Sequence, residues 1–153
     1  MHPNEELLTK FYTALSSRDP ETMAACYAAN ATFSDPVFPG LKDGEPQKMW
    51  RMLCGRSKDL SVTFKVHAAD DRAGSAEWVA TYSFSGTGNK VVNRIRSRFE
   101  FQQGKIIAQK DHFNLYTWMR QALGVKGLLL GWLPPVQASL RKQAKARLDA
   151  FKP

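Results

Sequence analysis

The hydrophobic pattern of this chain changes its period once, near Leu60. Before that point, apolar residues recur every three or four positions, which is typical of amphipathic helices. After it, apolar and polar residues alternate in four successive runs, which is typical of strands that bury one face. Helices followed by an antiparallel meander predict an α+β fold, in which the helices cover one face of the sheet.

Residues that start and stop helices divide the first sixty positions. An Asp followed by Pro restarts the chain after the first helix, and a Gly closes the third. The residue before a proline is pushed out of helical geometry, so a short extended piece at residues 31–34 and a loop separate the last two helices. We expect a first helix capped by Asn4 and two more that begin at Pro20 and Pro46, with the second ending near Asn30 and the third at Gly55.

The alternation also assigns each strand residue to one face of the predicted sheet. In the last run, Asp111 shares its face with Ile107, Gln109 and Phe113, so its carboxyl should point toward the apolar interior. A buried carboxyl needs a partner, a proton or a catalytic role. His112 falls on the outer face, although a register shift of one residue would exchange it with Asp111. The same alternation places Tyr82 and Ser97 inside, and Arg94, Arg96 and Arg98 outside.

Length and composition limit the classes of protein to consider. At 153 residues, the chain fits one domain whose core is large enough to hold a pocket. The longest apolar run is about seven residues, far below the ~20 needed to cross a bilayer. No signal segment opens the sequence, so we expect a cytoplasmic protein. Cys26 and Cys54 fit free, packed thiols, and three scattered histidines predict no metal site.

The net charge of +8 is concentrated at the carboxyl end. Residues 126–153 carry six Lys or Arg against one Asp, so we separate this segment from a predicted domain at residues 1–125. Its apolar residues recur at helical spacing, which predicts a basic amphipathic helix. Such a helix can dock on the domain or on a second subunit, which we favour, or lie on an anionic membrane surface. Nucleic acid is not expected, because the aromatic residues are not interleaved with the basic ones.

Two segments resemble a known superfamily. The run C-Y-A-A-N-A-T-F-S-D-P-V, Cys26 to Val37, resembles the helix–strand–Asp-Pro signature of ketosteroid isomerase-like proteins, a branch of the nuclear transport factor 2-like superfamily. The run D-H-F-N-L-Y-T-W from Asp111 resembles a motif of its polyketide cyclase-like (SnoaL-like) members. The resemblance covers residues 4–118. It implies a curved, mostly antiparallel sheet wrapped into a cone-shaped roll, packed against three N-terminal helices, with a deep pocket at the open end and a homodimer.

Residue by residue, the resemblance transfers unevenly. Asp35 falls on the general-base aspartate of the isomerases, but Phe11 stands where they have a tyrosine and Ser97 where they have a protonated aspartic acid. Tyr12 follows Phe11 but points about 100° away around the helix. Epoxide hydrolases of this fold use two aspartates bridged by an arginine. Asp35 and Asp111 could supply the two acids, while the arginines of the neighbouring strand point away.

We therefore predict a cofactor-independent enzyme of the isomerase, cyclase or hydrolase type, acting on an apolar carbonyl or polyketide-like substrate. Asp35 would be the base and Asp111 the second acid or base, because a poised carboxyl pair suits proton transfer next to a carbonyl. Each acid also has a structural interpretation: a turn residue for Asp35 and a buried hydrogen-bond acceptor for Asp111. The predicted substrate contacts are three polar residues, Tyr82, Ser97 and Gln109, and four aromatic ones, Trp50, Trp78, Phe99 and Phe113.

The competing hypothesis is a non-catalytic module of the same fold. It would bind an apolar ligand or a partner, and its basic tail would dock on a subunit or a membrane surface. Both hypotheses include a small apolar molecule as the partner. They differ in what they require of Asp35: an enzyme would lose turnover on Asp35→Asn, whereas a binding module would be nearly indifferent.

Overall fold

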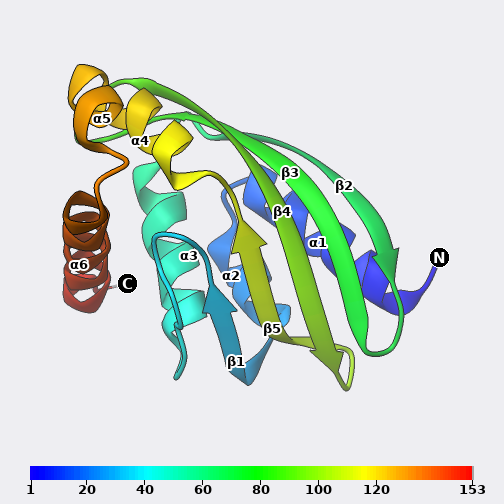
Figure 1. The fold of residues 1–153 in the computed structure, drawn as a ribbon. Coiled ribbons are helices and arrows are strands. Elements are labelled where there is room, and N and C mark those ends of the chain that lie inside the picture. Colours follow the sequence, from blue (N-terminus) through cyan, green and yellow to red (C-terminus); the bar gives the residue numbers. More distant parts are fainter. Residues whose placement is uncertain (153) are drawn as a thin grey trace.

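A curved sheet with helices packed on its concave side forms the molecule (Figure 1). The computed structural model describes residues 1–152. Two helices open the chain, α1 (Pro3–Ser16) and α2 (Pro20–Ala25), and strand β1 (Tyr27–Ser34) is followed by α3 (Glu45–Arg56). The remaining strands are β2 (Ser61–Ala69), β3 (Ala73–Ser83), β4 (Lys90–Gln102) and β5 (Lys105–His112).

Proline marks the start of each of these helices. α1, α2 and α3 carry Pro within their first two residues, where no backbone N–H donor is needed. The side chain of Asp19 caps α2 by accepting a 3.2 Å hydrogen bond from the N–H of Thr22. The predicted stop at Gly55 is wrong, because the helical backbone continues to Arg56 and the N–H of Ser57 still bonds to the carbonyl of Leu53.

The sheet has the order β1-β5-β4-β3-β2. Strands β2 to β5 form the antiparallel meander that the alternating pattern predicts, and β1 adds to β5 in parallel. The sheet is strongly curved and does not close on itself (Figure 1). The predicted fold class, an α+β roll with a mostly antiparallel sheet, is confirmed.

Strand β1 begins earlier than predicted. Helix α2 ends at Ala25 and the strand starts at Tyr27, whereas the sequence suggested a helix to near Asn30. Ala28 and Ala29 favour a helix when judged alone. Pairing with a strand distant in sequence decides their conformation, since Tyr27 lies opposite Ile106 of β5.

The predicted side of the sheet is correct for Ser97, Gln109 and Asp111, which are buried. It is also correct for the arginines of β4 and for His112, which are exposed on the outer face. It is wrong for Ile107. A bulge between Glu100 and Phe101 shifts the register between β4 and β5, so Ile106 faces the core instead.

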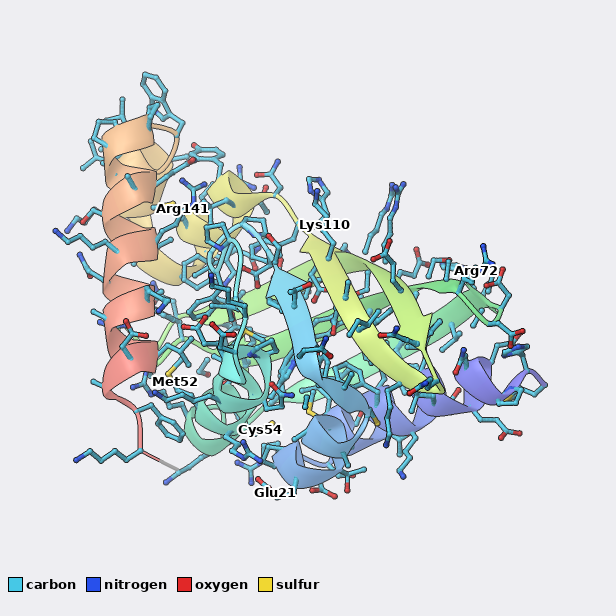
Figure 2. The ribbon with its side chains drawn as sticks, turned by 90° about the horizontal axis from the view of Figure 1, so that it is seen from below. Glu21, Met52, Cys54, Arg72, Lys110 and Arg141 are labelled. Atoms are coloured by element: carbon cyan, nitrogen blue, oxygen red, sulfur yellow. The ribbon has the colours of Figure 1, made fainter. Side chains whose placement is uncertain are left out.

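Three helices follow the sheet: α4 (Leu115–Leu123), α5 (Val125–Leu130) and α6 (Pro134–Ala150). α6 lies beside α3 (Figure 1), and its Leu148 is fully buried. Lys145 forms a 2.8 Å ion pair with Glu45. Arg141, on the side of α6 that faces the domain (Figure 2), donates a 2.8 Å hydrogen bond to the carbonyl of Pro36. The basic helix therefore packs on its own domain.

The separation of residues 1–125 from residues 126–153 stays a prediction, and Pro153, at the end of the predicted extension, lies outside the described residues. None of the helices within residues 1–152 has the length and apolar character needed to cross a membrane.

Candidate functional site

A buried carboxyl lies on the concave side of the sheet. Asp111 comes from β5 and is 4% exposed, and β4 places Ser97 directly opposite it. The Ser97 hydroxyl donates a 2.6 Å hydrogen bond to Oδ1 of Asp111, and the Gln109 amide donates another at 3.0 Å to the same oxygen. Within residues 1–152, no hydrogen bond ends on Oδ2. That oxygen is available for a proton or a ligand.

Two tryptophans and a tyrosine extend this network. Nε1 of Trp78 donates to the Ser97 oxygen at 3.0 Å. On the other side, the Tyr27 hydroxyl donates to Oε1 of Gln109, and Nε1 of Trp50 donates to the Tyr27 oxygen at 2.8 Å. These bonds fix the Gln109 amide with its N–H toward the carboxyl. The sequence did not point to Tyr27, because it was assigned to a helix.

Burial raises the pKa of Asp111 to about 7. The hydrogen bonds from Ser97 and Gln109 lower this pKa, and the charge of Asp35 raises it, each by less than burial does. A carboxyl with such a pKa is partly protonated near neutral pH. It can therefore either donate or accept a proton in a reaction.

Asp35 lies just after β1, half-buried, in a tight turn. Its Oδ1 accepts hydrogen bonds from the backbone N–H groups of Val37 at 2.7 Å and Phe38 at 2.6 Å, which is the turn role expected of an Asp before Pro. Burial raises the pKa of Asp35 to about 6, and the two N–H groups offset this only in part. Oδ2 makes no hydrogen bond in the described part of the chain.

The two carboxyls influence the same interior. The charge of Asp35 contributes to the raised pKa of Asp111 and also to that of Tyr82, for which burial is the larger cause. The Tyr82 hydroxyl accepts a 2.7 Å hydrogen bond from Nε1 of Trp118 on α4. The predicted polar contacts therefore divide into two groups. Ser97 and Gln109 both donate hydrogen bonds to Asp111. Tyr82 makes no such bond, and its pKa responds to the charge of Asp35.

Tyr12 joins the site, although its position one residue after Phe11 suggested otherwise. It is fully buried on α1, and its hydroxyl has no hydrogen-bond partner among the described residues. Its ring packs 5.7 Å from that of Trp78, which donates a hydrogen bond to Ser97 beside Asp111. Burial raises the pKa of Tyr12, and the charge of Asp111 raises it further. A signal was present in the sequence: Leu8, Phe11, Tyr12 and Leu15 follow the spacing of a wide buried helix face.

Aromatic side chains fill the concave side of the sheet. The ring of Phe99 packs edge-on against Phe11 and Tyr12, with centroids 6.3 and 6.2 Å apart. The rings of Trp50 and Trp78 lie 6.3 Å apart. The aromatic residues predicted as pocket wall are all buried in this cluster or beside it: Trp50, Trp78, Phe99 and Phe113.

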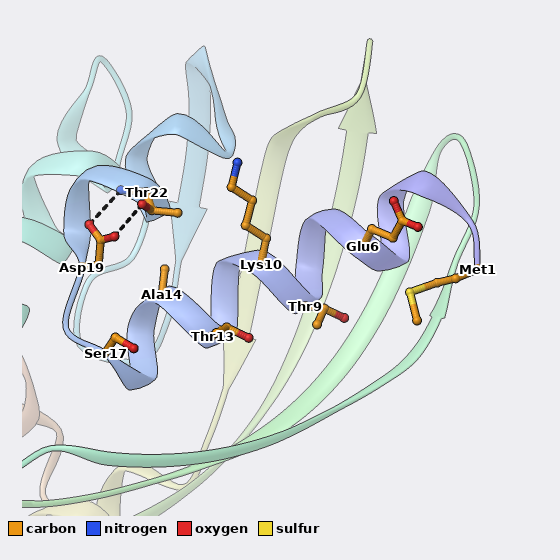
Figure 3. Close-up of a pocket in the computed structure, with 9 residues that line it drawn as sticks. All are labelled: Met1, Glu6, Thr9, Lys10, Thr13, Ala14, Ser17, Asp19 and Thr22. Carbon is orange, nitrogen blue, oxygen red and sulfur yellow. Dashed lines mark hydrogen bonds between the residues drawn. The ribbon is translucent and has the colours of Figure 1, made fainter.

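Two hollows stand out on the surface, and neither is lined by Asp35 or Asp111. One, of about 440 Å³, runs along the outer side of α1, with Lys10 near its middle and the Asp19 cap of α2 at one end (Figure 3). The other lies on the sheet between β2, β3 and β4. Neither is the deep pocket that the resemblance implies.

The histidines and cysteines of the described residues form no further reactive or metal-binding cluster. Over residues 1–152, no group of three or more His, Cys, Asp or Glu is placed to hold a metal ion. Cys26 and Cys54 are free and buried, and burial raises the pKa of both thiols.

Comparison with known proteins identifies a family. A family model described as the SnoaL-like domain matches residues 8–109. A search of curated proteins found no match to this sequence.

Solved structures share the fold at low identity. A protein from Catenulispora acidiphila with a ketosteroid isomerase-like fold, solved with trimethylamine, is 18% identical with a TM-score of 0.68, over 84% of this chain and 98% of that one. An LEH-like epoxide hydrolase from M. tuberculosis is 21% identical with a TM-score of 0.62, over 86% and 96%. IdmH from Streptomyces antibioticus, a polyketide cyclase candidate, is 19% identical with a TM-score of 0.66, over 81% and 100%. These likenesses show the fold alone.

Proposed function

This chain belongs to the SnoaL-like family, and from that premise we propose that it is a cofactor-independent enzyme that transfers protons on small apolar carbonyl or polyketide-like molecules. The observation that supports this most is the pair of carboxyls, Asp35 and Asp111, whose pKa values are raised to about 6 and about 7. An unperturbed Asp titrates near ~3.9 and is a weak base at neutral pH. Carboxyls tuned toward neutrality are the groups that general acid–base catalysis uses.

We assign Asp35 the role of the base, as the resemblance implies, and Asp111 the role of the acid. Near pH 7, Asp35 is mostly ionised, so it serves as the base that removes a proton from the carbon next to the carbonyl. Asp111 holds its proton more readily and serves as the acid, hydrogen-bonding the developing enolate oxygen through Oδ2. The proton taken by Asp35 then returns to the product. Both carboxyls end the cycle as they began it.

The surroundings of the acids support an apolar substrate with one polar group. The buried rings of Trp50, Trp78 and Phe99 line the concave side next to Asp111. The hydroxyl of Tyr12 has no partner within residues 1–152 and is suited to bond a substrate oxygen. Because these side chains pack against one another, substrate binding requires some of them to move aside.

A specific observation supports a second candidate function. The carboxyl of Asp35 holds a tight turn through two backbone hydrogen bonds, and that of Asp111 accepts two side-chain hydrogen bonds. Both roles are structural and need no reaction. With aromatic side chains filling the interior, a non-catalytic module that binds an apolar ligand or partner is the alternative.

Deuterium exchange separates the two candidates without knowledge of the natural substrate. An enzyme of the proposed kind, incubated in D2O with a panel of apolar cyclic ketones, speeds the loss of the proton signal next to the carbonyl. We expect Asp35→Asn to slow this exchange by about 10²–10⁴-fold. The substitution keeps Oδ1 for the turn, so the far-UV circular dichroism should not change.

The binding module has a different outcome. A ketone that perturbs the tryptophan fluorescence without proton exchange, and binds Asp35→Asn as tightly as the wild type, would refute the enzyme and support the module.

A further inference from the structure

Five apolar residues at one corner of the molecule are exposed. We call them the α5 tip: Val125, Leu128, Leu129, Leu130 and Trp132, with exposed fractions from 39% to 71%. Figure 1 shows α5 at the edge of the fold, outside α4. The other large apolar residues that are exposed within residues 1–152 are Met1 and Val92, which are isolated in sequence. A group of exposed apolar side chains of this kind marks an interaction surface.

The packing of α5 directs these side chains outward. Gly127 is buried against the last turn of α4, where an added Cβ would lie 2.0 Å from the carbonyl oxygen of Met119. The glycine side of α5 therefore packs backbone against backbone. The leucines that follow Gly127 have to face solvent, so their exposure is a property of the fold.

The backbone carbonyls of residues 127–131 are hydrogen-bonded within the protein. The carbonyl of Leu128 accepts a bond from the Tyr116 hydroxyl at 2.8 Å, and that of Leu129 from Nε1 of Trp132 at 3.1 Å. The carbonyls of Gly127, Leu130 and Gly131 accept bonds from the N–H groups of Gly131 and Leu133 and from the Gln137 amide. Five consecutive carbonyls thus need no water. This is a requirement for any segment that enters an apolar phase.

Positive charge alone surrounds the tip in the sequence. From His112 to Leu148 the chain has six Lys or Arg and no Asp or Glu. Arg120 lies over the ring of Tyr116, whose hydroxyl bonds to the tip, and Lys126 is exposed on α5 itself. Neither forms an ion pair in the described part of the chain. A second copy docked on this surface would bring like charges together, whereas an anionic surface neutralises them.

We propose that the α5 tip inserts into the surface of an anionic lipid bilayer. Leu129 and Trp132 enter the boundary between headgroups and acyl chains, where Trp is enriched in membrane proteins. Arg120 and Lys126 contact the negative groups of the lipids. The apolar stripe of α6 takes no part, because it packs against the domain. This inference does not depend on the proposed enzymatic function.

Vesicle binding tests the proposal. Trp132 is 62% exposed and the other three tryptophans are buried, so Trp132 reports on the tip. With vesicles of phosphatidylglycerol and phosphatidylcholine at low salt, we expect co-sedimentation, a blue shift of the emission and weaker quenching by acrylamide. Vesicles of phosphatidylcholine alone should bind less, because they lack the negative charge.

Matched variants locate the contact. We expect the double variant Leu129→Gln/Trp132→Gln to reduce vesicle binding about tenfold or more, since apolar burial drives insertion. Lys126→Glu should also weaken binding, and raising the salt concentration should weaken the binding of the wild type in the same direction. Val92→Gln, an exposed apolar residue of the sheet, is the control and should bind as the wild type does. The proposal is wrong if the wild type stays in the supernatant with anionic vesicles, or if the double variant binds unchanged. A wild-type dimer that the double variant converts to monomer in analytical ultracentrifugation would show a second copy as the occupant, which also overturns it.

Discussion

Asp111 combines full burial with hydrogen bonds to only one of its two oxygens. A carboxyl that served structure alone would gain from hydrogen-bond partners on both oxygens. Within residues 1–152, the fully buried side-chain atoms without a hydrogen-bond partner are the Tyr12 hydroxyl and Oε1 of Gln47. An unpaired hydroxyl, and a carboxyl with one oxygen that accepts no hydrogen bond, indicate a place where a ligand or a proton completes the hydrogen bonding.

Two tyrosine substitutions test this difference between paired and unpaired hydroxyls. Tyr27→Phe breaks the chain from Trp50 to Gln109, so it should destabilise the protein by about 1–3 kcal/mol. Tyr12→Phe removes a hydroxyl that bonds to nothing in the described residues, so it should be neutral or stabilise by about 1 kcal/mol. Urea unfolding of both variants measures the difference. Equal destabilisation by the two would show that the Tyr12 hydroxyl is hydrogen-bonded in the folded protein.

Sequence predicted some of these residues and not others, for physical reasons. Alternation along β4 and β5 predicts the burial of Ser97 and Asp111, because a strand has only two sides. Helix α1 is not limited to two sides in this way, and the face that buries Phe11 is wide enough to bury Tyr12 as well. The resemblance pointed to the position of Phe11 alone. Tyr27 was missed because its strand pairs with residues far away in the sequence.

At the scale of elements, glycine decides how α5 sits on α4. Gly127→Ala places a methyl group 2.0 Å from the Met119 carbonyl, a backbone clash that cannot be relieved by rotating a side chain. We expect a loss of stability of about 1–3 kcal/mol, typical of overpacking. Gly55→Ala in α3 is the matched control, since nothing lies within 4 Å of the added carbon. It should be neutral or stabilise by about 0.5–1 kcal/mol.

Thermal unfolding of the two alanine variants makes this comparison. A Gly127→Ala protein as stable as the wild type would show that α5 is not held against α4 as described, and the origin of the exposed tip would need another explanation.

The elements themselves were largely predictable. Four strands and three N-terminal helices follow from period and punctuation in the sequence. The predicted cap of the first helix is wrong, because the helix begins at Pro3 with His2 as its cap and Asn4 lies inside it. The exact ends were less predictable: Gly55 continues a helix because nothing in its surroundings opposes it. The apolar stripe of α6 predicts that this helix docks. Its contacts with Glu45 and Pro36 could not be predicted, because they depend on the position of the loop between β1 and α3.

At the scale of the whole molecule, the raised pKa values make folding stability depend on pH. The folded protein keeps a proton on Asp111 up to about pH 7, whereas an unfolded Asp releases it near pH ~3.9. Between those values the folded state binds more protons, so the free energy of unfolding falls as pH rises. For Asp111 the change is about 4 kcal/mol between pH 4 and pH 8.

Asp111→Asn should remove the part of this dependence that Asp111 contributes and leave the part that Asp35 contributes. Its Oδ1 still accepts from Ser97 and Gln109, and its side chain never ionises. We expect the variant to match the wild type at pH 4 and to be more stable above pH 7, as measured by urea unfolding at each pH. Exposed acids such as Asp19 and Asp59 have lowered pKa values, so their contribution to stability changes with pH in the opposite direction. Both the wild type and the variant contain these acids, so their contribution cancels in the difference between the two proteins. A stability difference that does not change with pH would contradict the raised pKa.

The overall roll was predictable because one change of period determines its layers, but the state of its interior was not. The alternation of apolar and polar residues places side chains inside without saying how they pack, and the contact between the rings of Trp50 and Trp78 could not be read from it. The homodimer stays a prediction.

The most direct test of the proposed acid–base pair is an NMR titration of the side-chain carboxyl carbons of Asp35 and Asp111 in the wild type and in Asp35→Asn. We expect Asp111 to titrate near pH 7 and Asp35 near pH 6, with the Asp111 value falling in the variant because one negative charge is removed. If both carboxyls titrate near pH ~3.9, and Asp111 does not respond to the loss of Asp35, the two acids are not a coupled pair, and the enzymatic function proposed for this chain is contradicted.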